Sequence, residues 1–517
     1  MSFLSFKFIL FIAAVFFTYF VVPKKFQWVV LLVFSYLYYF MNSHMLVGVL
    51  LYVSVFTFLM GKVIGSYTHR IKECADKQEK NKLSRTRKII LNSGIAAVLG
   101  NLVVIKYSDF FISNINSLFN GNFDLFNFVL PIGISFYTLQ AISYLIDVSK
   151  GKIEADDNVL HFMLYMSYFP QIIQGPIPRY SKLAKQLYEK HDYDYDRITK
   201  GLQLMFWGIA KKVVIADRIA APVRYIFDNY TDLHGIFILF GAICYSIQIY
   251  ADFSGGIDAI KGISEVFGIY LDDNFRQPYF SKSIEEFWRR WHITLGSWMK
   301  DYVFYPLSLS KGFNAIGKKV KKIFGDYAGK RTAPCLAMFV VYLLVGIWHG
   351  ASWKYVAYGV WNGLFIMCGI MFDQSYKNIL TKLKIDGDSK AWNIFRMIRT
   401  FLICSIGRIF SRAADLPSAI GMYRSMFDRF FDVSYLNTEI FEALGLNVKN
   451  WILLLIMVLI VLYFDYLKEK GMDIRKQIGS KNIVIRWMLY YILIISILVF
   501  GLYGGNYDAS SFIYGRF

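Results

Sequence analysis

Apolar runs long enough, or nearly long enough, to cross a bilayer constrain the fold of this chain more than any other feature. A soluble protein of 517 residues that is 56% hydrophobic has too little interior to bury that much apolar surface, so the surplus must face lipid. We therefore predict an all-α integral membrane protein with about 11–13 spans. The candidate spans are Leu4–Val22, Trp28–His44, Met45–Ile64, Ile89–Lys106, Phe128–Ile146, Gly201–Ala216, Gly235–Tyr250, Pro334–Gly350, Tyr355–Phe372, Ile394–Phe410, Trp451–Tyr466 and Trp487–Tyr503.

One further apolar stretch, Leu160–Pro176, is interrupted by prolines and glycine, which indicates a re-entrant segment packed inside protein. No hydrophilic block between the apolar runs is large enough to fold by itself. We therefore expect a single membrane domain over residues 1–517, in which the motif-rich part covers residues 127–372.

The net charge of +20 comes from basic residues in short loops between the apolar runs, as the positive-inside rule predicts. One topology places the basic loops at 69–90, 182–200, 311–331, 377–390 and 468–481 in the cytoplasm, and it leaves the N-terminus and the C-terminus outside. This distribution argues against nucleic-acid binding. The five cysteines are scattered without a C-x-x-C pair, and we expect neither a metal site nor a bound cofactor.

A polar, aromatic segment follows the seventh run. Ser283 is a candidate helix N-cap with Glu286 three residues on, so the sequence predicts an amphipathic helix over Ser283–Tyr302. Trp288 and His292, at i and i+4, would share one face of this helix. An interfacial helix with an aromatic belt is the alternative interpretation, and it leaves His292 unexplained.

The second unusual segment is Val345–Trp353, where His349 lies near the end of an apolar run. An ionisable side chain at this depth is costly unless it faces protein or a water-filled cavity. Nearby glycines indicate a close approach of two backbones, as around a tunnel or a tight helix crossing: Gly346, Gly350, Gly359 and Gly363. The alternative is a hydrogen-bonded interfacial histidine with no chemical role.

Of the seven histidines, only His292 and His349 lie in settings rich in tryptophan and glycine. Histidine is the natural general base near neutral pH. Neither a carboxylate-rich metal pattern nor a G-x-S-x-G elbow accompanies them. The pair therefore favours proton transfer during acyl transfer over metal-dependent hydrolysis or a serine nucleophile.

Five motifs resemble those of the membrane-bound O-acyltransferase (MBOAT) family, in family order and over about half of the chain. The resemblance is strongest to the bacterial branch that contains the membrane subunit of alginate O-acetylation and the D-alanyl transferase of teichoic acid. The motifs are Pro131–Gln140 with Tyr144 and Asp147, Phe169–Ile177, Tyr250–Gly256, Phe287–Leu295 and Gly346–Ala351.

The resemblance implies a ring of tilted helices around a central tunnel, with His349 as the family's signature histidine and His292 at its second polar position. It also implies acyl transfer in a bacterial cell membrane, from a cytosolic thioester to an acceptor reached from outside. We expect acetyl-CoA as donor, a hydroxyl of an extracellular polysaccharide or cell-wall polymer as acceptor, and an extracytoplasmic SGNH-type partner. His349 would deprotonate the hydroxyl, or a relay hydroxyl, and His292 would orient or polarise the donor.

Further residues of these motifs are candidates for donor binding or for lining the tunnel: Trp288, Arg289, Arg290, Trp291, Trp348, Tyr250, Asp252 and Ser254. The C-terminus resembles the aromatic tail of this branch, which makes Tyr514 a candidate acyl relay. An interfacial aromatic anchor is the alternative role for Tyr514.

Two other functions stay open. D-alanyl transfer to teichoic acid would use a thioester on a carrier protein instead of acetyl-CoA. A polysaccharide or lipid transporter would keep polar intramembrane residues without acyl chemistry, and transport would then survive His349→Ala. The length of the chain and its extra segment at Asn437–Leu446 favour the alginate-type subunit.

Overall fold

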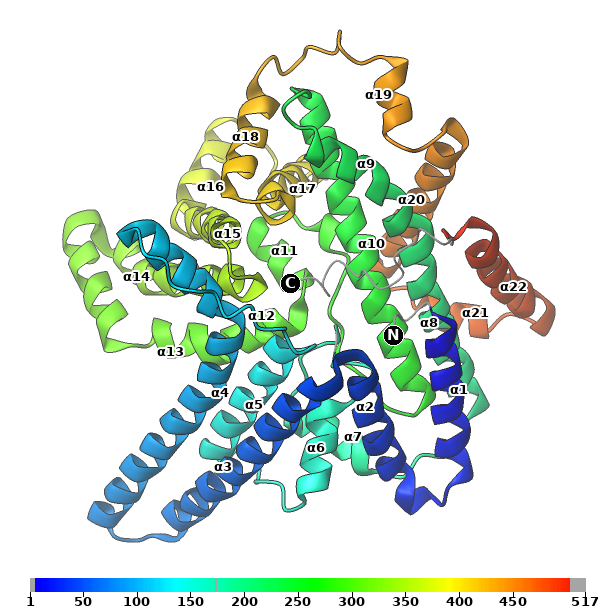
Figure 1. The fold of residues 1–517 in the computed structure, drawn as a ribbon. Helices are drawn as coiled ribbons and strands as arrows, with labels where there is room; N and C mark the ends of the chain where they lie inside the picture. Colours follow the sequence, from blue (N-terminus) through cyan, green and yellow to red (C-terminus); the bar gives the residue numbers. More distant parts are fainter. Residues whose placement is uncertain (1–4, 173, 503–517) are drawn as a thin grey trace. The chain divides into compact units, whose positions relative to one another are not determined.

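A computed structural model describes residues 5–172 and 174–502 of the chain (Figure 1). Within these ranges the regular elements are helices, and one isolated bridge pairs Phe275 with Trp291. This confirms the prediction of an all-α membrane protein. The described residues divide into two compact units, the first formed by residues from 5 to 205 and from 257 to 272 and the second by residues from 206 to 256 and from 273 to 502.

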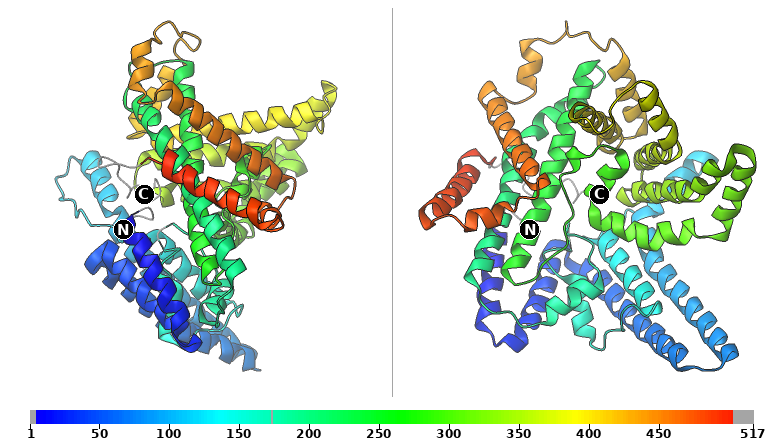
Figure 2. Two further views of the ribbon diagram at one scale, coloured as in Figure 1. Left: turned by 90° about the vertical axis from the view of Figure 1, so that its right-hand side faces the viewer. Right: turned by 180° about the vertical axis from the view of Figure 1, so that it is seen from behind.

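The first unit contains the N-terminal helices, of which α3 and α4 are the longest and lie side by side in every view (Figures 1 and 2). Asp76 caps α4 by accepting hydrogen bonds from the backbone N–H groups of Gln78 and Glu79. The helices are α1 (Phe6–Val21), α2 (Gln27–Ser43), α3 (Val47–Glu73), α4 (Lys77–Phe119), α5 (Ile134–Ser149), α6 (Val159–Ser167) and α7 (Tyr180–Tyr188).

The predicted re-entrant stretch begins as α6 and then turns. Tyr168 and Phe169 in the turn are fully buried, and the Ser35 hydroxyl of α2 accepts a hydrogen bond from the Phe169 N–H. The chain therefore runs through the interior of the first unit without a regular helix, which is tolerated in a membrane protein only where protein or water satisfies the backbone.

The second unit contains the remaining helices, and the boundaries between the units fall within α8 (Tyr195–Ala210) and α10 (Ile236–Val266). A π-helix, Lys211–Ala216, follows α8. The other helices are α9 (Asp217–Asp228), α11 (Ile284–Arg290), α12 (Ile293–Met299), α13 (Tyr305–Ser308), α14 (Lys311–His349), α15 (Trp353–Met371), α16 (Asp373–Lys382), α17 (Lys390–Arg412), α18 (Leu416–Phe427), α19 (Thr438–Ala443), α20 (Val448–Glu469), α21 (Ile474–Gly479) and α22 (Ile483–Phe500).

Helices α14 and α15 cross at very short distance. A Cβ atom on Gly346 would lie 2.3 Å from the Tyr355 carbonyl oxygen, and one on Gly359 would lie 2.6 Å from that of Tyr342. Only glycine fits at these positions, so the prediction of a tight helix crossing is confirmed. The crossing fixes the end of α14, where His349 lies.

Every predicted span overlaps a helix, but several boundaries differ. Helix α5 begins only at Ile134, because Pro131 and the left-handed Gly133 (φ 74°) precede it. Six helical segments of the described ranges are long and apolar enough to cross a membrane, or seven if the bent pair of α15 and α16 counts as one span. This number is lower than predicted because α2 and α3 form one continuous segment and other helices are shorter or carry charges.

Candidate functional site

His349 is the last residue of α14 and is buried, with 7% of its surface exposed. Its ring lies 5.2 Å from that of Trp348 and 6.1 Å from that of Tyr358 on α15, measured between centroids. The tight crossing through Gly346 holds the end of α14 against α15. The imidazole is therefore fixed in an aromatic environment from which bulk water is excluded.

His292 is equally buried, with 1% exposed, but it does not lie inside a helix. The predicted helix over Ser283–Tyr302 breaks here: α11 ends at Arg290, and His292 adopts a left-handed conformation (φ 49°, ψ 51°) before α12 begins. The prediction of one continuous helix, with Trp288 and His292 on a shared face, is therefore wrong. The N-cap prediction is confirmed, since the Ser283 hydroxyl accepts a hydrogen bond from the Glu286 N–H at 3.1 Å.

Asn274 causes the break, and no pattern in the sequence predicted this role. The Asn274 backbone carbonyl accepts from the Ile293 N–H at 3.0 Å, and its side-chain Oδ1 accepts from the N–H and the hydroxyl of Thr294 at 3.0 and 2.9 Å. These bonds replace the helical bonds that residues 293 and 294 would otherwise make. A left-handed non-glycine residue of this kind persists only where its surroundings impose it, which is common in functional sites.

Asn274 also sets the tautomer of His292. Its Oδ1 must be the acceptor, because the Thr294 N–H donates to it, and the Nδ1 atom of His292 lies 3.3 Å from the same oxygen. Nδ1 therefore carries the proton and Nε2 the lone pair. Burial, together with the nearby His349, lowers the pKa of His292 to about 3, so the ring stays neutral at physiological pH.

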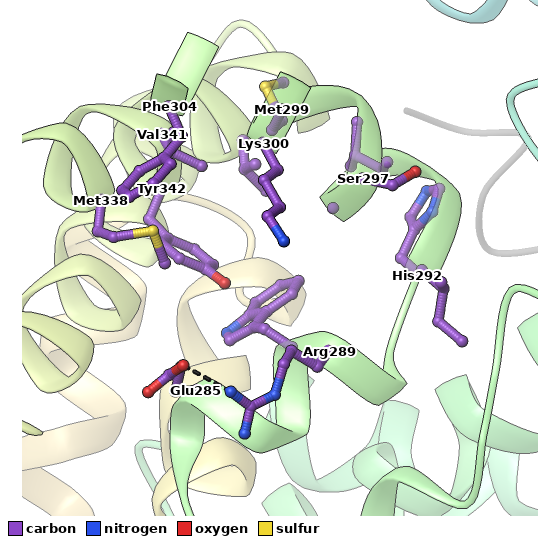
Figure 3. Close-up of a pocket in the computed structure, with 15 residues that line it drawn as sticks. Glu285, Arg289, His292, Ser297, Met299, Lys300, Phe304, Met338, Val341 and Tyr342 are labelled. Carbon is purple, nitrogen blue, oxygen red and sulfur yellow. Dashed lines mark hydrogen bonds and ion pairs between the residues drawn. The ribbon is translucent and has the colours of Figure 1, made fainter. Parts of the chain in front are cut away.

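The two histidines meet at one indole: the ring of Trp348 lies 5.8 Å from His292 and 5.2 Å from His349. His292 also lines a cavity of about 450 Å³ with largely apolar walls. In Figure 3 the Lys300 ammonium points into this cavity, whereas Arg289 points away and pairs with Glu285. The other lining residues are Trp288, Ile293, Leu295, Gly296, Ser297, Met299, Phe304, Met338, Val341, Tyr342 and Val345.

Three predicted tryptophans belong to this region. Trp288 lines the cavity and donates its indole N–H to the Asn362 Oδ1 on α15 at 3.0 Å. Trp291 packs against the ring of Phe287 at 5.4 Å and precedes His292 in the break. Trp348, the third, contacts the rings of both histidines.

The remaining predicted site residues bond to partners within the protein. Arg290 pairs with Glu286 at 2.7 Å and with Glu469 at 2.6 Å, and it is not among the residues that line the cavity. Tyr250 donates its hydroxyl to Asp465 at 2.6 Å. Tyr514 lies outside the described residues.

Asp252 and Ser254 contact two lysines of the π-helix. Lys212 Nζ lies 2.6 Å from Asp252 and 2.7 Å from Asp217, and Lys211 donates to the Ser254 hydroxyl at 2.8 Å. The extra residue that a π-helix inserts in each turn places both lysines inward, toward α10. This arrangement joins buried charges of opposite sign and faces no described cavity.

Sequence comparison gives the chain its family. A model of the membrane-bound O-acyltransferase family matches residues 154–320. A probable alginate O-acetylase of Pseudomonas putida is 31% identical over 79% of this chain and 76% of the relative. A peptidoglycan O-acetyltransferase of Helicobacter pylori is 32% identical over 66% of this chain and 65% of the relative.

A teichoic acid D-alanyltransferase of Bacillus subtilis is less similar, at 28% identity over 48% of this chain and 61% of the relative. The matched regions cover between 56% and 76% of the lengths of such relatives. The family match includes His292 and ends before His349, and the long alignments confirm the resemblance to the family. The chain belongs to the membrane-bound O-acyltransferase family.

Proposed function

We propose that this multi-pass membrane protein transfers an acetyl group from cytosolic acetyl-CoA to a hydroxyl of an extracellular polysaccharide or cell-wall polymer. The observation that carries the proposal is the meeting of two buried histidines at Trp348, one of them lining an apolar cavity with a cationic residue at Lys300. The narrow arm of a thioester donor fits such a cavity, and a lysine attracts the phosphates of the donor. Completion outside the membrane by an SGNH-type partner belongs to the same proposal.

In the reaction, His349 accepts the proton of the attacking hydroxyl while the oxygen of this hydroxyl bonds to the thioester carbonyl carbon. The C–S bond then breaks, and the imidazolium returns the proton to the departing thiolate. The products are an acetyl ester and the free thiol of CoA, so atoms and charge balance without any metal or redox step.

The tautomer of His292 decides between its two expected roles, which are to orient the donor or to polarise it. A ring with its proton on Nδ1 presents a lone pair at Nε2, which accepts a hydrogen bond but does not donate one to a thioester carbonyl. His292 therefore orients the donor, for example through an amide N–H of its arm, and does not polarise the carbonyl.

The donor is tested with radiolabelled acetyl-CoA. Membranes that contain the protein, co-expressed with the products of its neighbouring genes, are given acetyl-CoA labelled in the acetyl group. The label in the isolated polymer is then measured. The proposal predicts alkali-labile label that depends on this chain, with equimolar CoA thiol released. In a parallel reaction the donor is a labelled D-alanyl thioester on a carrier protein. Label that enters the polymer only in this second reaction would identify the D-alanyltransferase alternative. No label from either donor would favour a transporter.

A further inference from the structure

The least expected charge of the second unit is Arg408 on α17, which is 2% exposed. Three aromatic rings surround its guanidinium carbon: Trp291 at 4.5 Å, Phe287 at 5.4 Å and Tyr279 at 5.5 Å, measured to the ring centroids. Its Nη1 donates to the Tyr279 hydroxyl at 2.8 Å. Cation–π contacts of this kind gain strength when the cation is desolvated.

Unlike the buried Lys212, which pairs with two carboxylates, Arg408 lacks a counter-charge among the described residues. Among residues 5–172 and 174–502, no carboxylate lies within 4.0 Å of its guanidinium, and its Nη2 has no hydrogen-bond partner there. Arginine does not lose its proton in proteins, so the charge stays in the interior. A buried charge held in this way is expensive and calls for a role beyond packing.

Two tyrosines connect Arg408 to an acid. Tyr279 donates to the Ser246 carbonyl of α10, and its ring lies 5.0 Å from that of Tyr250. Tyr250 in turn donates to the buried Asp465 of α20 at 2.6 Å. Arg408, Tyr279, Tyr250 and Asp465 thus form one chain of contacts, which we call the tyrosine bridge, and Trp291 lies against its cationic end.

Trp291 is the residue directly before His292. Its backbone pairs with Phe275 in the isolated bridge, and its ring contacts Phe275 at 4.9 Å. The guanidinium covers the same indole at 4.5 Å. Asn274 therefore fixes the backbone that follows His292, while Arg408 fixes the side chain that precedes it.

We propose that Arg408 is a positioning residue for His292: its guanidinium, held by the tyrosine bridge, keeps Trp291 in place, and so keeps the imidazole in the left-handed turn beside Trp348. The proposal rests on the proposed function for its activity readout. Arg408 is not among the residues that line the described cavity, so it acts through Trp291.

The test is a double-mutant cycle on the full-length protein, with labelled acetyl transfer as readout. Arg408→Met keeps most of the volume but removes the charge, and it should lower kcat by about 30-fold with KM changed by less than about 3-fold. Arg408→Lys keeps the cation and should recover about 10-fold of that loss. The matched control, Arg412→Met, removes a cation one turn along α17 that lies over Phe227 instead, and should change kcat by less than about 3-fold.

In a His292→Ala background, Arg408→Met should cost less than about 3-fold more, because the residue that Arg408 positions is gone. An equal loss in both backgrounds would overturn the proposal, since Arg408 would then act independently of His292. The proposal would also be overturned if the loss of acetyl transfer in Arg408→Met were explained entirely by a smaller amount of folded protein.

A second readout needs no catalysis. The ¹⁵N shifts of the His292 ring, assigned by comparison with His292→Ala, report its tautomer. The wild type should show the Nδ1-protonated form alone, and Arg408→Met a mixture of both tautomers. An unchanged spectrum would contradict the proposal, whereas a changed spectrum in a protein without acyl transfer would sink only the proposed function.

Discussion

Two buried polar clusters of the second unit make opposite use of charge. At the π-helix, Lys212 contacts both Asp217 and Asp252, so buried charges neutralise one another. Around Trp348, two imidazoles lie among aromatic rings, and one of them, that of His292, lines a cavity. The first arrangement satisfies its groups within the protein and holds helices together, whereas the second places an imidazole at the wall of a cavity.

The largest effect on folding is expected at the π-helix. Lys212→Met leaves two buried carboxylates without their shared cation, and breaking a buried ion pair from one side costs about 3–5 kcal/mol. The yield of monodisperse protein in detergent, measured by size-exclusion chromatography, should fall at least tenfold. A tenfold fall corresponds to about 1.4 kcal/mol, so it is a lower bound for the expected loss. A normal yield with lost acetyl transfer would instead place Lys212 in the chemistry. Lys318→Met, at an exposed position of α14, is the control.

Asn274→Ala tests the second cluster, the histidines around Trp348. It removes the acceptor that fixes the tautomer and the turn of His292, so kcat should fall by about 10- to 100-fold, the equivalent of one or two lost buried hydrogen bonds. Measured at equal amounts of folded protein, Asn314→Ala on the exposed face of α14 should have no effect. Unchanged kcat in Asn274→Ala would show that the tautomer of His292 is irrelevant.

Lys300 tests the cavity itself. Lys300→Gln removes the cation that points into the cavity, so KM for acetyl-CoA should rise by about 3- to 10-fold, and less at high salt, with kcat almost unchanged. Initial rates over a range of acetyl-CoA concentrations decide this. A fall in kcat at constant KM would contradict a role in donor attraction, and Lys318→Gln, at an exposed position of α14, controls for the loss of one positive charge.

The smallest effect concerns the pH dependence of stability. His292 is neutral in the fold down to a pKa of about 3, whereas the unfolded imidazole takes a proton below about pH 6.5. The unfolded state therefore binds more protons between these values, and stability contributed by His292 is present above about pH 6.5 and is lost as the pH falls.

Thermal unfolding in detergent measures this effect. Between about pH 7.5 and about pH 5 the wild-type Tm should fall by a few degrees more than that of His292→Gln, which cannot be protonated. Parallel curves for the two proteins would mean that the folded pKa of His292 is not lowered.

The contrast between the clusters also shows what the sequence can reveal. Apolar runs predicted the helices because each run must be buried in lipid or protein, and the glycines around His349 correctly predicted a tight crossing. Asp252 and His292 look alike in sequence, as polar residues within aromatic motifs. Only the structure separates them, because the partner of Asp252 comes from a π-helix distant in sequence.

The break at His292 escaped prediction for a similar reason. Helical spacing from Ser283 onward is regular, and Asn274, which interrupts it, precedes the segment by several residues in an irregular stretch. Arg408 was missed because it lies near the end of an apolar run that also contains Arg396 and Arg399, and an arginine there usually indicates a helix end. Long-range contacts of this kind have no local pattern, whereas the family motifs did mark the neighbourhood in which they occur.

The central claim is that His349 is the base of acyl transfer and not a structural histidine. Acetyl transfer from labelled acetyl-CoA should be measured for wild type, His349→Ala and His69→Ala at matched amounts of monodisperse protein, since His69 is an exposed histidine of α3. We predict that His349→Ala lowers incorporation by at least about 1,000-fold with an unchanged Tm, and that His69→Ala matches wild type. Incorporation by His349→Ala at the wild-type rate would contradict the account.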